Sequence, residues 1–288
     1  MHIDPYIVLG AAVVGLFVGM TGAGGGALMT PMLILLFGVE PSKAITSDLV
    51  AAVLMRPVGA AVHFRGGTVN MRLVKWLVIG SVPMAFLGTY LLHLLGHTKS
   101  SEKHIEVILG IALLVGAAAM VVRFFIDRNH QRERHQHVSE LFVKPIPTLI
   151  IGIIGGVMVG LTSVGSGSLM IVMLLFLYPL IGANQLVGTD LAQAVPLTIA
   201  AAIGAVIFGK VEFGVTLSLI IGSVPAVFVG ALLSSTAPDR YIRPVITFVI
   251  FASGLKYVGL GTTELGWVLV ITLVAAFLVW HGDDRRAG

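Results

Sequence analysis

Nine long apolar segments make up most of this chain. They run over residues 5–38, 44–64, 73–95, 105–126, 145–178, 185–208, 213–233, 244–260 and 265–281. Several reach the length of about 20 residues that a helix needs to cross the roughly 30 Å hydrocarbon core of a bilayer. Backbone polar groups find no water inside that core, so segments of this kind are expected to be helical. The sequence therefore predicts an all-α membrane protein that crosses the bilayer many times.

The composition agrees with a membrane protein. Only 11% of the residues are charged, against roughly 25% in a soluble globular domain. The chain has no cysteine, which excludes disulfides and thiolate metal sites, and no cofactor is expected. The net charge of +4 lies in loops and is interpreted as a signal of orientation, not of nucleic-acid binding. Asp4 and Pro5 precede the first apolar segment without a basic region, so that segment is expected to be retained.

The two halves of the chain repeat each other on either side of one polar stretch, Asp127–Glu140. The pentapeptide IGSVP occurs at Ile79 and again 142 residues later, and Asp48 matches Asp190 at the same separation. A separation of 141 residues aligns a further set, Gly15, Gly19, Gly24, Gly26, Met29 and Met32 with Gly156, Gly160, Gly165, Gly167, Met170 and Met173. Shared apolar composition does not produce a five-residue identity in register with a polar pair, so an internal duplication is predicted.

The first apolar segment of each half is too long for one crossing and is interrupted by glycine. The interruptions read TGAGGG from Thr21 and TSVGSGS from Thr162. Each segment is interpreted as a pair of short helices, fully spanning or re-entrant, that returns to its side of entry and precedes three spanning helices. The second half then begins on the opposite side from the first. This is the inverted-topology arrangement of many secondary transporters.

The predicted fold is thus an all-α polytopic membrane protein of two inverted repeats with one extra C-terminal helix. Its expected domains are an N-terminal repeat over 1–126, a basic linker over 127–144, a C-terminal repeat over 145–262, and the extra helix and tail over 263–288. Basic residues in short loops mark the cytoplasmic side, so the linker and the C-terminus are placed in the cytoplasm. The expected location is the cell (inner or plasma) membrane.

The two glycine-rich breaks are the first candidate for a binding site. Non-helical backbone at membrane depth is tolerated only where protein buries it or where it lines a cavity. Helices that restart near Ala27 and Ser168 would direct free N–H groups and positive dipole ends toward the breaks, which favours an anion. Alternatively, the small residues only permit tight helix packing, the preferred interpretation for Gly15, Gly19, Gly156 and Gly160. The candidate substrate-binding residues are Thr21, Gly22, Gly24, Gly25, Gly26, Arg56, Thr162, Ser163, Ser166, Gly167, Ser168 and Gln193.

Arg56 lies near the middle of an apolar segment, directly before Pro57. A charged arginine at bilayer depth costs from about 3 to more than 10 kcal/mol, so its side chain should face the protein interior and have a partner. The partner is either a substrate oxyanion, held by two parallel hydrogen bonds, or a structural contact with Asp48 or with carbonyl groups freed by the proline.

Asp48 and Asp190 occupy matching places in the two halves. They are candidates for coupling transport to protons or sodium, or for capping helices at a re-entry point. Gln193 follows Asp190 by three residues and is expected on the same helical face. His135 and His137 have metal-like spacing, but a solvated basic loop explains them better.

The sequence resembles the sulfite exporter TauE/SafE family. The resemblance rests on MTGAGGGALMTPML in the first half, GLTSVGSGSLM and LVGTDLAQAVPLT in the second, and the paired GSVP segments. It extends over nearly the whole chain. It implies a membrane carrier for sulfite, sulfoacetate or related sulfonates, or for another small organic anion. Arg56 is not part of the family motif, and the serines at 163, 166 and 168 replace glycines of the first break, so the two breaks need not bind alike.

Other classes of function are less well supported. Ser166 lies in VGSG, but the second half has no histidine before His281 and the chain has no HExxH sequence, so an enzyme is not expected. A non-transporting membrane assembly subunit is the remaining alternative. The expected partners are a small anionic solute and the lipid bilayer; a homodimer is compatible with the sequence.

Overall fold

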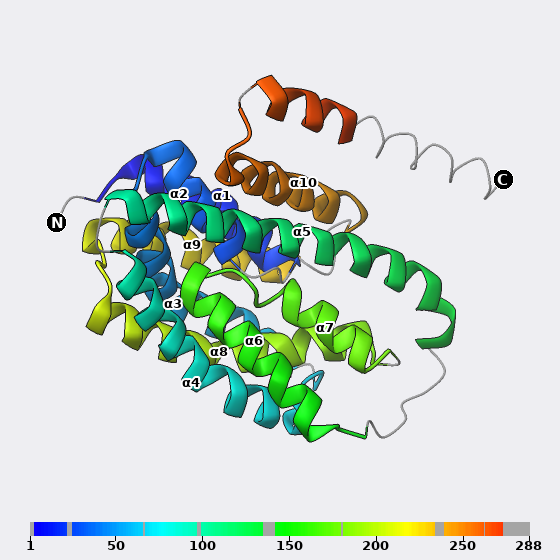
Figure 1. Cartoon of the computed structure of the whole chain (residues 1–288). Helices are drawn as coiled ribbons and strands as arrows, with labels where there is room; N and C mark the ends of the chain where they lie inside the picture. The colour runs from blue at the N-terminus through cyan, green and yellow to red at the C-terminus, as the bar shows by residue number, and fades with distance from the viewer. Residues whose placement is uncertain are drawn as a thin grey trace.

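The computed structural model describes residues 3–21, 25–65, 67–96, 99–134, 142–179, 181–233, 239–261 and 263–272. In this part of the chain the regular secondary structure is all helical. Figure 1 shows the arrangement of the helices. Their bounds are α1 Pro5–Thr21, α2 Gly26–Phe37, α3 Pro41–Arg65, α4 Met71–Leu95, α5 Lys99–Arg134, α6 Pro145–Thr162, α7 Leu169–Leu177, α8 Ala183–Phe208, α9 Phe213–Leu233 and α10 Asp239–Val258. A further short helix, Thr263–Thr272, follows α10.

Six of these helices are long and apolar enough to cross a membrane. The spans are Pro41–Ala61, Met71–Leu95, Glu102–Arg123, Pro145–Thr162, Gln185–Phe208 and Phe213–Leu233. They confirm the predicted all-α protein with many membrane helices. Helix α5 continues to Arg134, so helix extends into the region 127–144 that the sequence suggests as a linker.

Both glycine-rich interruptions break the helix, as predicted. Helix α1 ends at Thr21 and α2 begins at Gly26, while α6 ends at Thr162 and α7 begins at Leu169. Helix α2 has 12 residues and α7 has 9. At about 1.5 Å per residue they are about 18 and 14 Å long, which is well short of a membrane crossing.

The broken helices pack reciprocally across the two halves. Helix α1 lies against α9 of the second half, and α6 lies against α4 of the first. A Cβ atom on Gly15 would come within 2.9 Å of Ser223 Cα, and one on Gly156 would come within 2.8 Å of Ser81 Cα. Since each glycine and each serine matches the other in the repeat, the same contact is made twice. The preferred interpretation of Gly15 and Gly156 as packing residues is confirmed.

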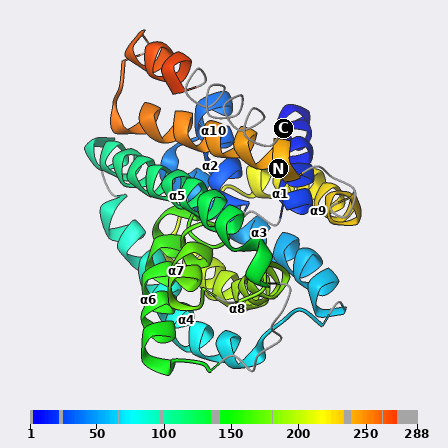
Figure 2. The same cartoon turned by 90° about the vertical axis from the view of Figure 1, so that its right-hand side faces the viewer.

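The buried hydrophobic residues form three clusters. One lies among α4, α6, α7 and α8, with Ile45 and Leu49 of α3 and Ile105 of α5. A second joins α1, α2, α3 and α9, and a third lies between α5 and α10 and includes residues of α2. Helices α5 and α10 lie side by side over the other two groups, as Figures 1 and 2 both show. Val164 in the second break belongs to the third cluster, and Met170 just after the break belongs to the first.

Candidate functional site

The breaks of the two halves touch each other directly. The α-carbon of Gly26, the first residue of α2, lies so close to the backbone of Ser163 that a Cβ atom would collide with the Ser163 carbonyl group. Only glycine permits such an approach. Gly26 is therefore occupied by a protein contact, and the residues that follow Thr162 lie at the centre of the molecule.

Ser163 ends α6 in the left-handed conformation, with φ 59°. This conformation is uncommon for a residue with a side chain. Its backbone N–H donates to the Val159 carbonyl, and its hydroxyl donates to Asp48 Oδ2 at 2.7 Å. Thr30 of α2 donates to the same oxygen at 3.0 Å. The Asp48 carboxylate thus joins α3 to both broken helix pairs.

Arg56 lies two turns after Asp48 on α3, and its side chain is only 8% exposed. Its Nη1 donates to the hydroxyl oxygen of Ser166 in the second break, whereas its Nη2 has no hydrogen-bond partner among the residues that the structure describes. The guanidinium attracts both Asp48 and Asp190 electrostatically, but it forms no direct ion pair within the described residues. Both interpretations of Arg56, as a ligand of a substrate oxyanion and as a structural partner of Asp48, stay predictions.

Asp190 on α8 is 1% exposed, as is Asp48 on α3. Gln193 Nε2 donates to its Oδ1 at 3.1 Å, which confirms that the two side chains share a helical face. Asp48 and Asp190 both lie inside their helices, eight residues into each. The capping alternative for the two carboxylates is therefore wrong.

The other predicted residues lie near this cluster with different orientations. Thr21 and Thr162 each donate to a carbonyl of their own helix at 2.7 Å. The Ser168 hydroxyl is buried, has no partner among the described residues, and lies close to Gly116 of α5. Gly25 borders Met55 of α3. Gly22 and Gly24 lie outside the described residues, as do His135 and His137.

Three residues of the cluster are absent from the sequence prediction. Thr30 contacts Asp48, Ser81 donates to Gln193 Oε1 at 3.4 Å, and Met170 Sδ accepts from Gln193 Nε2 at 3.1 Å. Ser81 belongs to the duplicated IGSVP and Met170 to the aligned glycine segments, so the repeat itself pointed to both. Thr30 is an isolated polar residue in an apolar helix, and its spacing from Asp48 gives no such signal.

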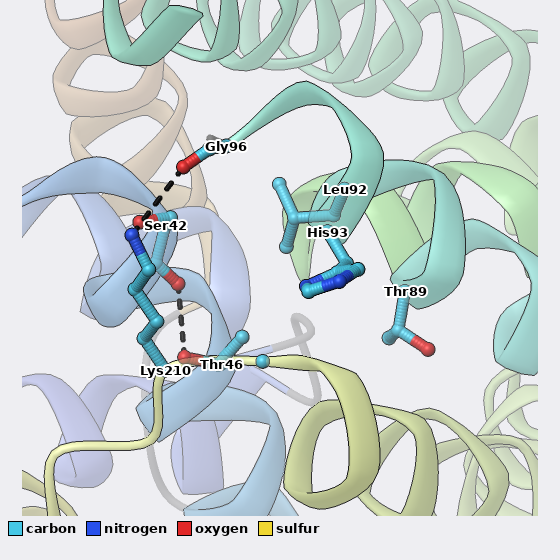
Figure 3. A pocket seen from close by; sticks show the side chains of 8 residues that line it. Ser42, Thr46, Thr89, Leu92, His93, Gly96 and Lys210 are labelled. Atoms are coloured by element: carbon cyan, nitrogen blue, oxygen red, sulfur yellow. Dashed lines mark hydrogen bonds between the residues drawn. The ribbon is translucent and has the colours of Figure 1, made fainter. Parts of the chain in front are cut away.

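A separate pocket lies at one end of α3, α4 and α8, and Figure 3 shows its lining. Lys210 reaches across it to the Gly96 carbonyl at 3.4 Å, where α4 ends. Thr46 and Thr89 already donate their hydroxyl hydrogens to carbonyls of their own helices, at 2.9 and 2.7 Å. The pocket therefore presents few free donors to an anion, and the lysine stabilises a helix C-terminus.

The buried cluster is suited to hold a small anion together with a cation. It supplies one guanidinium with a free nitrogen, two carboxylates, and serine hydroxyls at a non-helical break. Within the described residues, no group of three or more histidine, cysteine, aspartate or glutamate side chains could hold a metal ion. Polar groups buried among membrane helices are characteristic of transport proteins, so fold and site together define a multi-pass membrane protein of the transporter class.

The chain belongs to the family described as Sulfite exporter TauE/SafE, which it matches over residues 7–257. It is 40% identical over 253 residues to Probable membrane transporter protein YjnA of Bacillus subtilis (strain 168), covering 88% of this chain and 98% of the relative. Probable membrane transporter protein YdhB of the same organism is 24% identical, covering 86% and 98% of the two chains. No solved structure matches. The resemblance seen in the sequence is confirmed, and membership in a transporter family agrees with the expectation that the chain is not an enzyme.

Proposed function

We propose that this protein is a secondary transporter of small sulfur-containing oxyanions such as sulfite, sulfoacetate or related organosulfonates. It moves them by alternating access around the cluster where the two helix breaks meet. The observation that carries the proposal is the buried guanidinium of Arg56. It contacts Ser166 of the second break through one nitrogen, and its other terminal nitrogen has no partner in the described part of the chain.

An oxyanion is the ligand that best completes this site. A buried guanidinium with an unsatisfied nitrogen is costly among membrane helices, and a ligand that accepts two parallel hydrogen bonds removes that cost. Sulfite and sulfonate groups present adjacent oxygens for such a contact. The name of the family supports this substrate class.

The charges of the cluster support coupling to a cation. Arg56 brings one positive charge, and Asp48 and Asp190 bring two negative charges if both are ionised. Adding an oxyanion would increase the excess of negative charge in a buried site, which is strongly unfavourable. A proton or a sodium ion taken up with the anion offsets this excess. Asp48 and Asp190 are accordingly assigned the coupling role.

The reciprocal packing supports two repeats related by a pseudo-two-fold axis, and three spanning helices after each returning pair would make the second repeat inverted. In two repeats related by a pseudo-two-fold axis, a contact between α1 and α9 requires a matching contact between α6 and α4, and both are present. We assign the repeats to 1–126 and 145–262, joined by the linker over 127–144 and followed by the segment 263–288. The short α2 and α7 are assigned as the returning arms of re-entrant pairs, with the linker and the C-terminus in the cytoplasm.

Flux measurements in proteoliposomes test the function. We expect saturable uptake and efflux of labelled sulfite and sulfoacetate but not of chloride, and faster net uptake when a pH or sodium gradient is imposed. Movement of a carboxylate anion alone would instead make the protein a carrier of another organic anion. If none of these anions moves, the transport proposal is wrong, and an assembly subunit becomes the better interpretation.

A further inference from the structure

The second break is held on α3 by two side-chain hydrogen bonds. At its start, the Ser163 hydroxyl donates to Asp48 Oδ2 at 2.7 Å. Three residues later, Ser166 accepts a hydrogen bond from Arg56. The loop between Ser163 and Ser166 is therefore fixed to α3 at both of these residues.

The backbone of this break has an unusual shape that needs such support. Ser163, Gly165 and Gly167 have φ values of 59°, 131° and 89°, all in the left-handed region. Glycine adopts these values without strain, but Ser163 carries a side chain and does so only when its surroundings hold it there. Its two supports are the N–H bond to Val159 within α6 and the hydroxyl bond to Asp48.

We infer that Ser163 is a positioning residue that transmits the state of the Asp48 carboxylate to the anion site. While Asp48 accepts from the Ser163 hydroxyl, the break holds Ser166 against Arg56. When the carboxylate is neutralised by the coupling cation, this charge-assisted hydrogen bond weakens and the break relaxes. The link to anion binding rests on the proposed function. The hydrogen bond between Ser163 and Asp48, called the latch from here on, is a property of the protein alone.

Ser163 makes contacts that a serine with only a packing role does not make. Its carbonyl and hydroxyl lie against the α-carbon of Gly26, so a movement of the second break would directly displace the first. The latch thus joins α3 and both broken helix pairs. Ser253 of α10 provides the contrast, because its buried hydroxyl donates only to the Val249 carbonyl of its own helix.

Amide hydrogen exchange of the full-length protein in lipid nanodiscs tests the latch without any substrate. We expect the amides of Val164–Gly167 to exchange at least tenfold faster in Ser163→Gly, which accepts the left-handed conformation but lacks the hydroxyl. Asp48→Ala should give a similar increase, and Asp48→Asn a smaller one. The double variant with Ser163→Gly and Asp48→Ala should not exceed the larger single effect, because both remove one interaction. Ser253→Ala should match the wild type.

Wild-type exchange rates in both Ser163→Gly and Asp48→Ala, or additive effects in the double variant, would overturn the latch. Sulfite binding to the same variants, followed by its protection of these amides, tests the link to the anion site. We expect about tenfold weaker sulfite binding in Ser163→Gly. A faster-exchanging break with unchanged sulfite affinity would overturn that link. Absence of sulfite binding to the wild type would instead contradict the proposed function, while the exchange rates would still decide whether the latch exists.

Discussion

At the scale of single residues, anion binding by Arg56 is expected to depend on the geometry of its guanidinium group and not only on its charge. Through Nη1 it contacts Ser166, and no described residue accepts a hydrogen bond from Nη2. A lysine at this position keeps the charge but cannot make two directed contacts at once. We therefore expect Arg56→Lys to raise the KM for sulfite about tenfold, which corresponds to about 1.4 kcal/mol. An unchanged KM in initial-rate uptake would show that the fork geometry is not used.

Asp190 is expected to matter for the driving force and less for exchange. It is buried on α8 and held by Gln193, and its replacement by asparagine removes a group that can gain or lose a proton or bind a cation. We predict that Asp190→Asn loses gradient-driven accumulation of sulfite by at least tenfold but retains exchange of internal for external sulfite. Glu40→Gln, on the exposed pair with Lys43, is the control. Normal accumulation by Asp190→Asn would remove it from the coupling role.

Part of this cluster was predictable from the sequence. Gln193 lies beside Asp190 because residues three apart share a helical face. The paired breaks pointed to Ser163 and Ser166, since a repeated interruption of membrane helices needs a function. It was not predictable that Ser168 points toward α5, or that Ser166 is the partner of Arg56. Both depend on residues in the left-handed backbone conformation, and no pattern of residue types specifies where the side chains after them point.

At the scale of elements, the reciprocal packing of α1 on α9 and α6 on α4 makes a paired prediction. Gly15 and Gly156 each face the backbone of a serine on the partner helix, where a larger side chain finds no room. We expect Gly15→Val and Gly156→Val to destabilise the protein equally, each by about 3 kcal/mol, in denaturation experiments in detergent.

Gly182→Val is the matched control for this pair, because no heavy atom of the described structure lies within 4 Å of a Cβ atom at that position. A large loss of stability at only one of the two packing glycines would show that the halves do not pack equivalently.

The bounds of most helices were predictable within a few residues from the apolar segments, because glycine, proline and polar loops end them. Helix α5 is the exception. The stretch from Asp127 to Arg134 is polar and suggested a loop, yet it is helical, and its arginine, glutamine and glutamate residues have high helix propensity. The packing of each broken helix on the opposite half was not predictable, since periodicity gives the buried face but not the partner.

At the scale of the whole molecule, the inverted topology predicts that equivalent residues face opposite sides of the membrane. Met71 at the start of α4 and Phe213 at the start of α9 are 142 residues apart, and they are 59% and 58% exposed. Because the chain has no cysteine, Met71→Cys and Phe213→Cys each introduce a single labelling site. We expect an impermeant maleimide to label Met71→Cys only from the cytoplasmic side and Phe213→Cys only from the outer side. Labelling of both from one side would contradict the inverted repeat.

The proposed path of the oxyanion through the membrane passes the buried cluster around Arg56. The most direct test is sulfite flux in proteoliposomes containing Arg56→Ala, compared with the wild type and with Arg72→Ala, which removes an exposed arginine of α4. We expect Arg56→Ala to insert and fold normally but to lose sulfite transport, whereas Arg72→Ala transports at the wild-type rate. Sulfite transport at the wild-type rate by Arg56→Ala would show that the oxyanion does not pass through this cluster.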